Sequence, residues 1–535
     1  MKVVTAAEMK ELDKKASEIY AVPGLVLMDQ AAKAVADVVA AELQDREGKA
    51  VLFCGKGNNG GDGFGAARWL AAAGIPVKVF LVGAACEDIT GDAAYELNML
   101  LKAGVKVESI TKEEDLLYAE IASLKAAVIV DALLGTGFHG ELRPLLGKVC
   151  ELINAAAKPV VAVDIPTGVN ADDGSAAADA VKAKVTVTMA LLKSGLLCYP
   201  GKELAGRVLV AAIGMPEKLL VEAPSKKYYV TEAIVAELLP DRKADAHKGD
   251  AGRVVVVAGS PGFTGAAAMS SYAAVKTGSG LVSLLTPLSC QNVLSVKLTE
   301  IMVHGLLERM PGVLGGGAVN DILQRAAKAD VLALGPGLGT SESTSQVIRE
   351  VLAKTETPVV LDADGLTAVA DHTELLHEMQ APKVLTPHPG ELSRLTGLSA
   401  KEINADRIGV ATKYAKEWNC VLVVKGAPTI VASPEGDIYI NSTGCSAMAT
   451  GGSGDVLTGI IASLAGQEIS LLEAAVCGVY VHGVAGTLAT AGAPGLAAGE
   501  MSAYVPQVVQ NIKNKQKNLN NNVGSVYNFA LKGVQ

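Results

Sequence analysis

Short apolar runs alternate with longer amphipathic segments along most of the chain, and this alternation predicts the fold. In the first half, runs rich in Val and Ile occupy residues 51–54, 77–82, 128–130 and 160–163, with helical segments between them. The buried strands of a parallel sheet that is covered on both faces have this continuous apolar character. We therefore expect an α/β protein that begins with a doubly wound, Rossmann-like three-layer sandwich.

Two helices are expected before the first of these strands. Thr5 and Glu8 have the spacing of a capping box, which is typical of a helix N-terminus. The Pro-Gly pair at residues 23–24 ends this helix, and an Ala- and Val-rich second helix runs to about Leu43.

The alternation is interrupted at residues 217–231, and a second series of apolar runs then begins. We expect a second three-layer α/β sandwich there, closed by Ala-rich helices. Its predicted strands include residues 254–257, 331–334, 359–361, 384–385 and 421–424. The predicted organisation is a domain at 1–220, a linker at 221–235, a second domain at 236–512 and a polar, Asn-rich tail without a site at 513–535.

Three loops of the first domain are candidates for a ligand site, because ligands on such sheets bind beyond the carboxyl ends of the strands. These loops are 55–68, 131–141 and 164–168, and they should open at one edge of the sheet. The first is rich in glycine and leads into a helix expected at 66–73, which is an arrangement suited to phosphate.

Four polar residues in these loops allow two interpretations. Asp131 and Asp164 either cap turns at the ends of strands, or they act together with Asn59 and the Thr167 hydroxyl group. In the second case these residues supply oxygen ligands for a hard cation.

In the second domain, the stretch TGGSGDVLTG at 450–459 joins a glycine turn to an apolar helix. Free N–H groups and the helix dipole make such a turn an anion site. Asp455 would lie at the helix N-terminus. It is either an ordinary helix cap or a general base for a hydroxyl group that approaches a bound phosphate.

Three more residues of this domain follow predicted strands at the same edge. Gly337, in the loop GPGLG, lets the backbone approach a ligand closely. His388 lies between two prolines and is either structural or a ligand contact. Lys425 ends an apolar strand and needs an anionic partner, which is either a phosphate group or a nearby acidic side chain.

Composition excludes several classes of function. The chain has 535 residues, of which 50% are hydrophobic and 19% are charged, as in soluble α/β proteins. A net charge of −9 argues against nonspecific nucleic-acid binding. No uninterrupted apolar run has membrane-spanning length and no signal sequence is evident, so we expect a cytoplasmic protein without a membrane partner. The eight cysteines and seven histidines are scattered, which argues against a zinc site.

The motifs GKGNNGGDG, DALLGTG and DIPTG, together with residues 191–216, resemble the epimerase half of the bacterial bifunctional NAD(P)H-hydrate repair enzymes. The resemblance covers roughly residues 1–215. It implies epimerisation of hydrated NADH or NADPH at the carbon that bears the added hydroxyl group, with Asp164 contacting the substrate and handling the proton. It also implies K⁺ ligands at Asn59, Asp131 and Thr167. The implied dinucleotide site consists of Asn58, Asn59, Gly60, Gly61, Asp62, Gly135, Thr136, Gly137, Phe138, His139, Gly140 and Glu141.

The second half resembles the ribokinase-like dehydratase domain of the same enzymes, through the motifs HKGDAGRVVVVAGS, FTGAA, LGPGLG, VLDADGL, LTPHPGE, VKGAPT and GGSGDVLTG. The resemblance implies dehydration of the S hydrate with ADP (or ATP) as phosphoryl donor, giving AMP and phosphate, and Mg²⁺ is expected with the nucleotide. Asp455 would be the base. The implied contacts to the damaged coenzyme are Ala266, Gly337, His388 and Asp455, and those to the nucleotide are Lys425, Gly426, Ala427, Pro428, Thr429 and Gly454.

Two alternatives remain at this point. The second domain could be a small-molecule kinase, because that fold and its glycine turn are shared, and the first domain could be a nucleotide-binding scaffold without activity. In each case the expected partners are small molecules rather than nucleic acid, and we expect a homo-oligomer.

Overall fold

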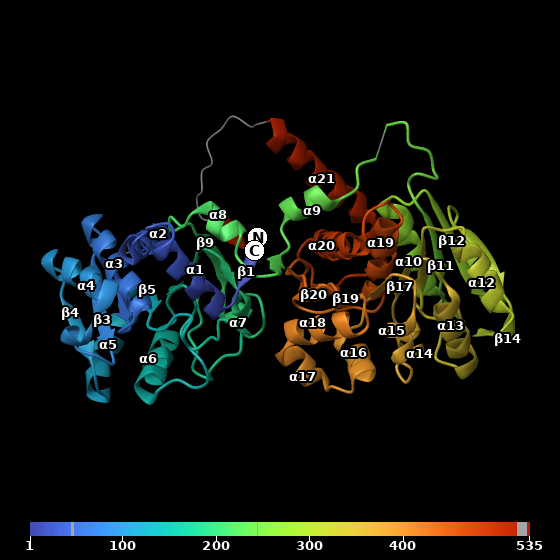
Figure 1. Ribbon diagram of the computed structural model, residues 1–535. Helices are drawn as coiled ribbons and strands as arrows, with labels where there is room; N and C mark the ends of the chain where they lie inside the picture. Colours follow the sequence, from blue (N-terminus) through green and yellow to red (C-terminus); the bar gives the residue numbers. More distant parts are fainter. Residues whose placement is uncertain (44–45, 47, 243, 522–531, 535) are drawn as a thin grey trace. The chain divides into compact units, whose positions relative to one another are not determined.

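The structure is a computed structural model that describes residues 1–43, 46, 48–242, 244–521 and 532–534 (Figure 1). The chain forms two compact units. The N-terminal unit comprises Met1–Lys227 and Val526–Gln535, and the C-terminal unit comprises Tyr228–Ser525. Each unit contains a large, mainly parallel sheet, so the predicted fold class is confirmed.

The sheet of the N-terminal unit has the strand order β22-β9-β7-β6-β5-β2-β3-β4. All neighbouring strands are parallel except β22, which is antiparallel to β9. The predicted apolar runs fall within β2, β3, β5 and β6, which confirms these four strands. The strands are β2 (Lys49–Cys54), β3 (Val77–Val82), β4 (Val107–Ile110), β5 (Ala126–Ala132), β6 (Val160–Val163), β7 (Val185–Met189), β9 (Arg207–Ala211) and β22 (Lys532–Val534).

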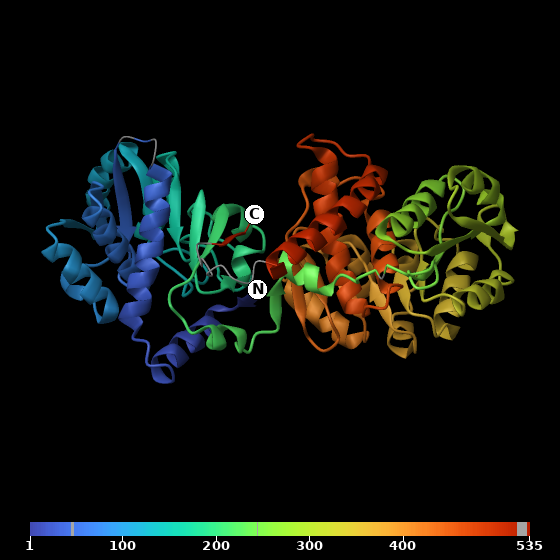
Figure 2. The same ribbon diagram turned by 90° about the horizontal axis from the view of Figure 1, so that it is seen from above.

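Helices cover both faces of this sheet (Figures 1 and 2). Leu52 packs into the core formed with α1–α4, whereas its neighbours Val51 and Phe53 pack into the core formed with α5 and α6. The Thr5 side chain accepts the Glu8 N–H at 3.2 Å and the Glu8 carboxylate accepts the Thr5 N–H at 2.7 Å, so the capping box is confirmed. The helices are α1 (Ala6–Glu18), α2 (Gly24–Leu43), α3 (Asn58–Ala72), α4 (Gly91–Lys102), α5 (Leu116–Leu124), α6 (Pro144–Ala155), α7 (Gly201–Ala205) and α8 (Glu217–Val221).

The sheet of the C-terminal unit contains the series β13-β12-β11-β16-β17-β18-β19-β20-β21. The first seven strands of this series, from β13 through β11 to β19, are parallel, and β20 and β21 extend the sheet in antiparallel fashion. The strands are β11 (Arg253–Val257), β12 (Leu281–Pro287), β13 (Met302–Leu306), β16 (Val331–Leu334), β17 (Val359–Leu361), β18 (Lys383–Leu385), β19 (Val421–Val424), β20 (Thr429–Ala432) and β21 (Ile438–Asn441). The five apolar runs predicted in this half are therefore strands.

One face of this second sheet packs on α9, α10 and α19–α21, which share a core cluster with its strands, and α13–α18 lie on the other face (Figure 1). The helices are α9 (Glu232–Leu238), α10 (Thr264–Thr277), α11 (Leu288–Lys297), α12 (Ala318–Ala326), α13 (Glu342–Lys354), α14 (Asp364–Ala368), α15 (Glu374–Glu378), α16 (Pro389–Thr396), α17 (Ala400–Ala405), α18 (Arg407–Glu417), α19 (Ser453–Ala465), α20 (Leu471–Thr490) and α21 (Met501–Asn521).

The remaining elements are short. Strands β1 (Lys2–Val4) and β8 (Leu192–Lys193) pair in parallel within the N-terminal unit, and β14 (Glu308–Met310) and β15 (Val313–Leu314) form a hairpin. Strand β10 covers Lys227–Tyr229. The 3₁₀ turns are η1 (Cys86–Asp88), η2 (Glu113–Asp115), η3 (Ser194–Leu196), η4 (Ser446–Met448) and η5 (Ala498–Glu500).

Two expectations need correction. The loop predicted at 55–68 is mostly helix, because α3 begins at Asn58 rather than near residue 66. The predicted tail continues α21 as far as Asn521 and contributes strand β22, while residues 522–531 and 535 lie outside the described part of the chain. Within that part, α20 is long and apolar enough to cross a membrane by length and composition alone, and 56% of its apolar window is buried in the unit.

Candidate functional site

The three candidate loops of the N-terminal unit open at the same edge of its sheet, as predicted. Strands β2, β5 and β6 are consecutive neighbours and parallel, so their carboxyl ends meet. Asn59 follows β2, Asp131 lies at the end of β5, and Asp164 and Thr167 follow β6. The fold therefore gathers these four polar residues from three separate loops.

Asp131 and Thr167 form a buried pair in the middle of this edge. Both are fully buried, and the Thr167 hydroxyl donates to Asp131 Oδ1 at 2.6 Å while its backbone N–H donates to Oδ2 at 2.7 Å. Burial raises the pKa of Asp131 to about 6, which the Thr167 hydrogen bonds partly offset. No cationic side chain of the described residues forms a salt bridge with this carboxylate.

Asn59 completes an oxygen-rich set of donors beside this pair. A side chain on Gly135 would meet Asn59 Oδ1 at 3.2 Å, so the amide lies directly against the loop after β5. Its Nδ2 atom is buried without a hydrogen-bond partner among the described residues. A carboxylate without a cationic partner, a hydroxyl and an amide oxygen are the ligand types of a hard monovalent or divalent cation, so these residues fit one chemically.

The first turn of α3 offers free backbone donors at this edge. No hydrogen bond from the N–H groups of Asn58, Asn59 or Gly60 to another described residue is present, and the N-cap Gly57 provides no side-chain cap. Such a helix N-terminus favours anionic groups. Burial, together with the Asp164 carboxylate, raises the pKa of Asp62 well above its ordinary value.

The glycines of α3 are required by packing rather than by the backbone conformation. A side chain on Gly60 would overlap the carbonyl oxygen of Gly55, and one on Gly63 would meet Ala132 and Cys54 at 2.6 and 2.7 Å. The helix consequently lies close against β2 and β5. This is why a sequence rich in glycine forms a helix here.

The loop at 135–141 lies at the same edge, and its side chains differ in exposure. Phe138 is only 7% exposed and belongs to the buried core, whereas His139 and Glu141 are exposed. His139 Nδ1 lies 3.3 Å from Asn170 Nδ2. Phe138 therefore packs into the core, whereas His139 and Glu141 are accessible.

Asp164 is held by a buried lysine that sequence reasoning did not single out. Its Oδ1 atom accepts hydrogen bonds from Lys193 Nζ at 2.6 Å, from the Thr188 hydroxyl at 3.0 Å and from the Met189 N–H at 3.1 Å. Lys193 is completely buried. No described residue donates to Oδ2, which is therefore available to a ligand. The signal in the sequence was a lone lysine within LLKSGLL, where a charge needs an anionic partner.

Asp164 also has a backbone conformation that few residues adopt. Its φ of +63° lies in the left-handed region, where aspartate is more common than most non-glycine residues. Observed strain of this kind is concentrated at functional sites.

In the C-terminal unit, the five candidate loops also meet at one edge. Strands β11, β16, β17, β18 and β19 are consecutive and parallel, so the loops that follow them open on the same side. The glycine turn then leads into α19, whose N-cap is Gly452 with a φ of +95° and no side-chain cap.

Asp455 is not the cap of α19. It lies in the first turn, three residues after Gly452, and the backbone N–H groups of Gly454 and Asp455 donate to no described residue. Burial raises the pKa of Asp455 to about 7, and the nearby Asp362 carboxylate adds to this shift. A carboxyl group that is half ionised near neutral pH beside free N–H groups can exchange a proton next to a bound anion.

Lys425 is paired with acidic side chains, in agreement with the plainer of its two interpretations. Its Nζ donates to Asp362 Oδ1 at 2.7 Å and lies 3.7 Å from Glu391. Burial alone would lower the pKa of Lys425, but these carboxylates raise it. The Thr458 hydroxyl donates to Asp362 Oδ2 at 2.6 Å. Lys425 also lies 3.2 Å from the position of a side chain on Gly454, so this pair adjoins the glycine turn.

Asp362 is a second residue that sequence reasoning missed. It is 1% exposed and lies at the start of DADGL, directly after β17. Its two oxygens join Lys425 to α19 through Thr458. An aspartate at the carboxyl end of a central parallel strand was the available signal.

Gly337 and Ala266 lie together at this edge. Gly337 has a φ of +64°, and a side chain there would meet the Cβ atoms of Ala266 and Phe263 at 3.0 Å. His388 instead has a structural role in α16: its Nδ1 accepts the N–H groups of Gly390 and Glu391 at 3.0 and 3.3 Å. Its ring remains half exposed.

The loop at 425–429 follows β19, and a buried arginine is hydrogen-bonded to the backbone where the loop begins. Arg407 donates from Nη2 to the carbonyl oxygens of Val424 at 3.1 Å and Lys425 at 2.9 Å. A side chain on Gly426 would collide with this guanidinium group. The bond between Ala427 and Pro428 is cis, and Thr429 begins β20.

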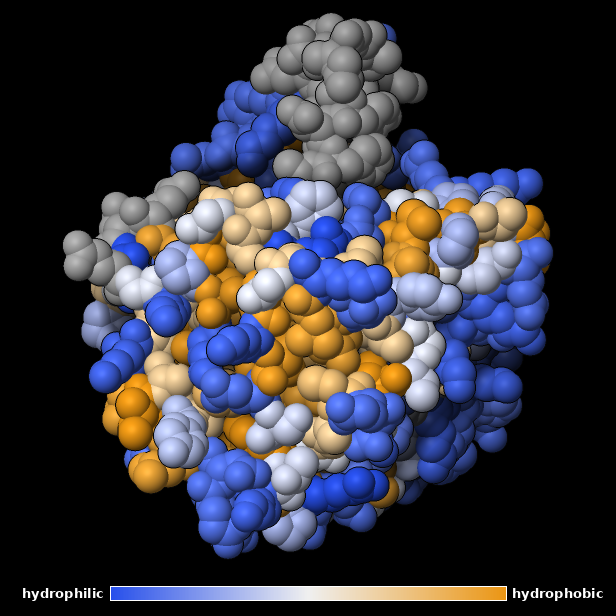
Figure 3. All heavy atoms as spheres, turned by 90° about the vertical axis from the view of Figure 1, so that its left-hand side faces the viewer, coloured by the Kyte–Doolittle hydropathy of each residue, from blue (hydrophilic) through white to orange (hydrophobic). Residues whose placement is uncertain are grey.

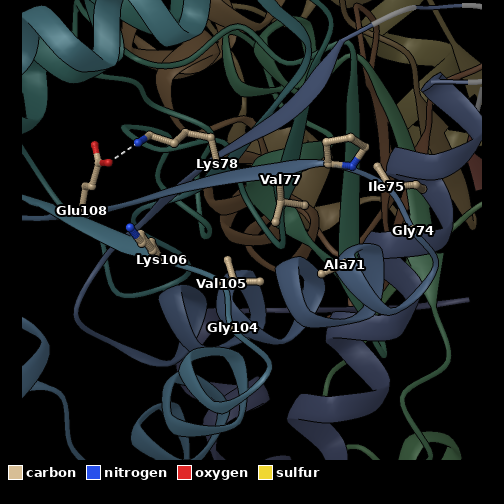
Figure 4. A pocket seen from close by; sticks show the side chains of 10 residues that line it. Ala71, Gly74, Ile75, Val77, Lys78, Gly104, Val105, Lys106 and Glu108 are labelled. Atoms are coloured by element: carbon tan, nitrogen blue, oxygen red, sulfur yellow. Dashed lines mark hydrogen bonds and ion pairs between the residues drawn. The ribbon is translucent and has the colours of Figure 1, made fainter.

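A surface pocket lies away from these edges. It has a volume of about 390 Å³ and adjoins the amino ends of β3 and β4, where Lys78 pairs with Glu108 (Figure 4). None of the predicted site residues lines this pocket.

Comparison with known proteins gives matches over both units. Residues 24–195 match the family described as "YjeF-related protein N-terminus", and residues 254–507 match "NAD(P)H-hydrate dehydratase". The chain is 45% identical to the bifunctional NAD(P)H-hydrate repair enzyme of Moorella thermoacetica, over 96% of this chain and 97% of that protein. It is 41% identical to the enzyme of the same name from Thermofilum pendens, with the same coverage of both chains. Among solved structures, an ADP/ATP-dependent NAD(P)H-hydrate dehydratase from Bacillus subtilis is 32% identical, with a TM-score of 0.47, over 53% of this chain and 98% of that one.

Proposed function

The chain belongs to the family of bifunctional NAD(P)H-hydrate repair enzymes, and we propose that each of its two units carries one of the two activities at its own sheet edge. The enzyme epimerises the R and S hydrates of NADH and NADPH and dehydrates the S hydrate with ADP. The observation that best supports two separate sites is a carboxylate beside free helix N–H groups in each unit.

In the N-terminal unit, Asp164 handles the proton during epimerisation. Three donors fix its Oδ1 atom, and Oδ2 has no partner among the described residues. A carboxylate held in this way can accept a proton from the substrate and return it without moving. Lys193 is the positioning residue of this carboxylate, because its buried ammonium group sets the orientation of Oδ1.

The dinucleotide binds across the free N–H groups of α3 and the loop after β5. The backbone donors of α3 suit the pyrophosphate, since a helix N-terminus favours an anion. Asn59, Asp131 and Thr167 would hold K⁺, which supplies charge compensation for the buried Asp131 carboxylate. The proposed substrate contacts are Asn58, Asn59, Gly60, Gly61, Asp62, Gly135, Thr136, Gly137, Phe138, His139, Gly140, Glu141 and Asp164.

In the C-terminal unit, Asp455 is the base for phosphoryl transfer. It accepts the proton of the hydroxyl group on the hydrated ring while the oxygen attacks the β-phosphorus of ADP and AMP leaves. The N–H groups of Gly454 and Asp455 stabilise the transferring phosphoryl group. Phosphate is a good leaving group, and its departure, together with loss of the proton on the neighbouring ring carbon, forms the double bond that restores the dihydropyridine.

The nucleotide lies between the glycine turn and the loop after β19. Lys425 adjoins this turn and can bring its positive charge to the phosphates, and Asp362 accepts a hydrogen bond from it at 2.7 Å. Mg²⁺ accompanies the nucleotide. The proposed nucleotide contacts are Lys425, Gly426, Ala427, Pro428, Thr429 and Gly454, and those to the hydrated coenzyme are Ala266, Gly337, His388 and Asp455.

We also propose a cytoplasmic homo-oligomer whose partners are small molecules rather than nucleic acid. The net charge of −9 supports the last point. Figure 3 shows apolar residues gathered on the side of the N-terminal unit. Exposed apolar side chains on α4 and α5 support contacts between copies, namely Tyr95, Leu117, Tyr118, Ile121 and Leu124.

The test is to supply the purified chain with the S hydrate of NADH, ADP and Mg²⁺ and to quantify every product. We expect one AMP and one phosphate for each NADH recovered. A stable phosphorylated product without recovery of NADH would instead indicate a small-molecule kinase.

A further inference from the structure

A buried histidine contacts the first residue of α19, at the proposed phosphoryl-transfer site. His482 lies on α20 and is 9% exposed. Its Nε2 atom lies 2.9 Å from the carbonyl oxygen of Ser453 and 3.3 Å from the Ser453 hydroxyl. Neither residue was singled out in the sequence.

A serine hydroxyl beside an imidazole could be a nucleophilic pair, but the carbonyl contact excludes it. A carbonyl oxygen only accepts hydrogen bonds, so the Nε2 atom of His482 must carry a proton in order to bond Ser453. A protonated Nε2 has no lone pair with which to take the hydroxyl proton. Burial lowers the pKa of His482 to about 4, so the ring is neutral near pH 7 and this N–H donor is permanent.

The direction of this hydrogen bond fixes the role of the Ser453 hydroxyl. Toward His482 the oxygen can only accept, and its own proton is therefore free for another acceptor. No described residue accepts that proton. Ser453 is the first residue of α19 and precedes Gly454 and Asp455, whose N–H groups are also unengaged. Three donors are thus concentrated on one turn.

We propose that Ser453 is a further catalytic residue, whose hydroxyl group donates a hydrogen bond to the phosphoryl group being transferred, and that His482 is the positioning residue that orients this hydroxyl. The inference rests on the proposed dehydratase function. Donors that are oriented before the reaction need no rearrangement as charge develops, which is why a fixed hydroxyl is more effective than a rotating one. Hydrogen bonds to anionic oxygens are also stronger than neutral ones.

The first test compares Ser453→Ala with the wild type. We expect ADP–Mg²⁺ affinity, measured by calorimetry, to fall about threefold to tenfold and the turnover number for dehydration to fall about 10- to 100-fold. Ser463→Ala is the matched control, since Ser463 lies on the same helix but bonds Ser279 at 2.7 Å. It should leave ADP affinity and turnover unchanged. Affinity and turnover within twofold of the wild type in Ser453→Ala would overturn the proposal.

The second test asks whether His482 acts through Ser453. His482→Leu should lower turnover by no more than Ser453→Ala does, because the Ser453 hydroxyl remains but is free to rotate. The double variant should be no slower than Ser453→Ala, because His482 acts only through that hydroxyl. His482→Gln retains an N–H donor and should recover turnover to within about threefold of the wild type. Fully additive losses would remove His482 from the positioning role. If His482→Leu does not fold, the turnover numbers of His482→Gln and Ser453→Ala still test the proposal: near-normal turnover is expected for the first and a loss for the second.

The proposed function and this inference fail in different ways. A wild-type chain that binds ADP but restores no NADH would refute the function. The ratio of ADP affinities between wild type and Ser453→Ala tests the hydroxyl contact without any hydrated coenzyme.

Discussion

The replacement Asp362→Asn should shift the pH dependence of dehydration. Burial raises the pKa of Asp455 to about 7, and the Asp362 carboxylate is the largest charged contribution to that shift. Asparagine keeps the shape of the side chain and removes its charge. It also weakens the hold on Lys425, which is bonded to Asp362 at 2.7 Å and itself lowers the pKa of Asp455. Both effects lower the pKa of Asp455.

The size of the effect follows from the role of Asp455 as a base. Only the ionised carboxylate accepts a proton, so activity rises with pH through the pKa of about 7. The ionised fraction of such a group is about one tenth at pH 6 and about nine tenths at pH 8, and kcat/KM for the S hydrate should rise about tenfold over this range. Loss of one neighbouring like charge should move the midpoint down by about one to two pH units.

A rise in pH has opposite effects on the stability of the fold and on activity. The pKa of Asp455 is higher in the folded than in the unfolded chain, so its contribution to folding is greatest at low pH. That contribution is lost as the pH rises through about 7, because the ionised carboxylate is then buried beside Asp362. Stability therefore falls as the pH rises toward about 7, and activity rises as the pH passes through about 7.

The assay is kcat/KM for the S hydrate at saturating ADP, between pH 5.5 and 9, for the wild type, Asp362→Asn and Asp364→Asn. Asp364 serves as the matched control: it lies two residues away, contributes less to the pKa of Asp455, and accepts the Gly339 N–H at 2.8 Å. We expect a smaller shift for Asp364→Asn. A wild-type profile that is flat between pH 6 and 8, or a midpoint that Asp362→Asn leaves in place, would refute the role of Asp455.

Three further predictions test other parts of the account. Asp455→Asn should abolish dehydration while ADP still binds by calorimetry, and near-normal turnover would remove Asp455 from the mechanism. Asp131→Asn should abolish any K⁺ dependence of the epimerisation rate, measured in buffers with and without K⁺. A K⁺ response equal to that of the wild type would show that the cation binds elsewhere. Gly60→Ala should lower the free energy of unfolding in urea by about 1–3 kcal/mol, because its Cβ would overlap the Gly55 carbonyl oxygen. Gly57→Ala, which has open space around the new side chain, should lower this free energy by less than about 1 kcal/mol. Equal losses in the two variants would contradict the packing argument.

The strands and the loops after them were predictable because continuous apolar runs leave few alternatives. The runs at 51–54 and 160–163 had to be buried, and parallel pairing then placed Asn59, Asp131 and Asp164 at one edge. The capping box of Thr5 was predictable for a different reason, because the local spacing of Thr5 and Glu8 determines it.

The start of α3 was not predictable from the sequence, because glycine disfavours a helix unless tertiary packing offsets its conformational entropy. Here the compensation is tertiary: Gly60 and Gly63 lie against backbone and small side chains of β2 and β5. The partners of the two carboxylates were also hidden. Lys193 is far from Asp164 in sequence, and Asp362 is far from Lys425. Only the sheet brings the ammonium and carboxylate groups of each pair within 2.7 Å.

The most direct test of two sites serving one damaged coenzyme is the recovery of NADH from a mixture of R and S hydrates with excess ADP. The wild type should convert the whole mixture. Asp164→Ala should convert the S share at the normal rate and the R share only as fast as the epimers interconvert spontaneously. Rapid and complete recovery by Asp164→Ala would contradict the assignment of an epimerase site to the N-terminal unit.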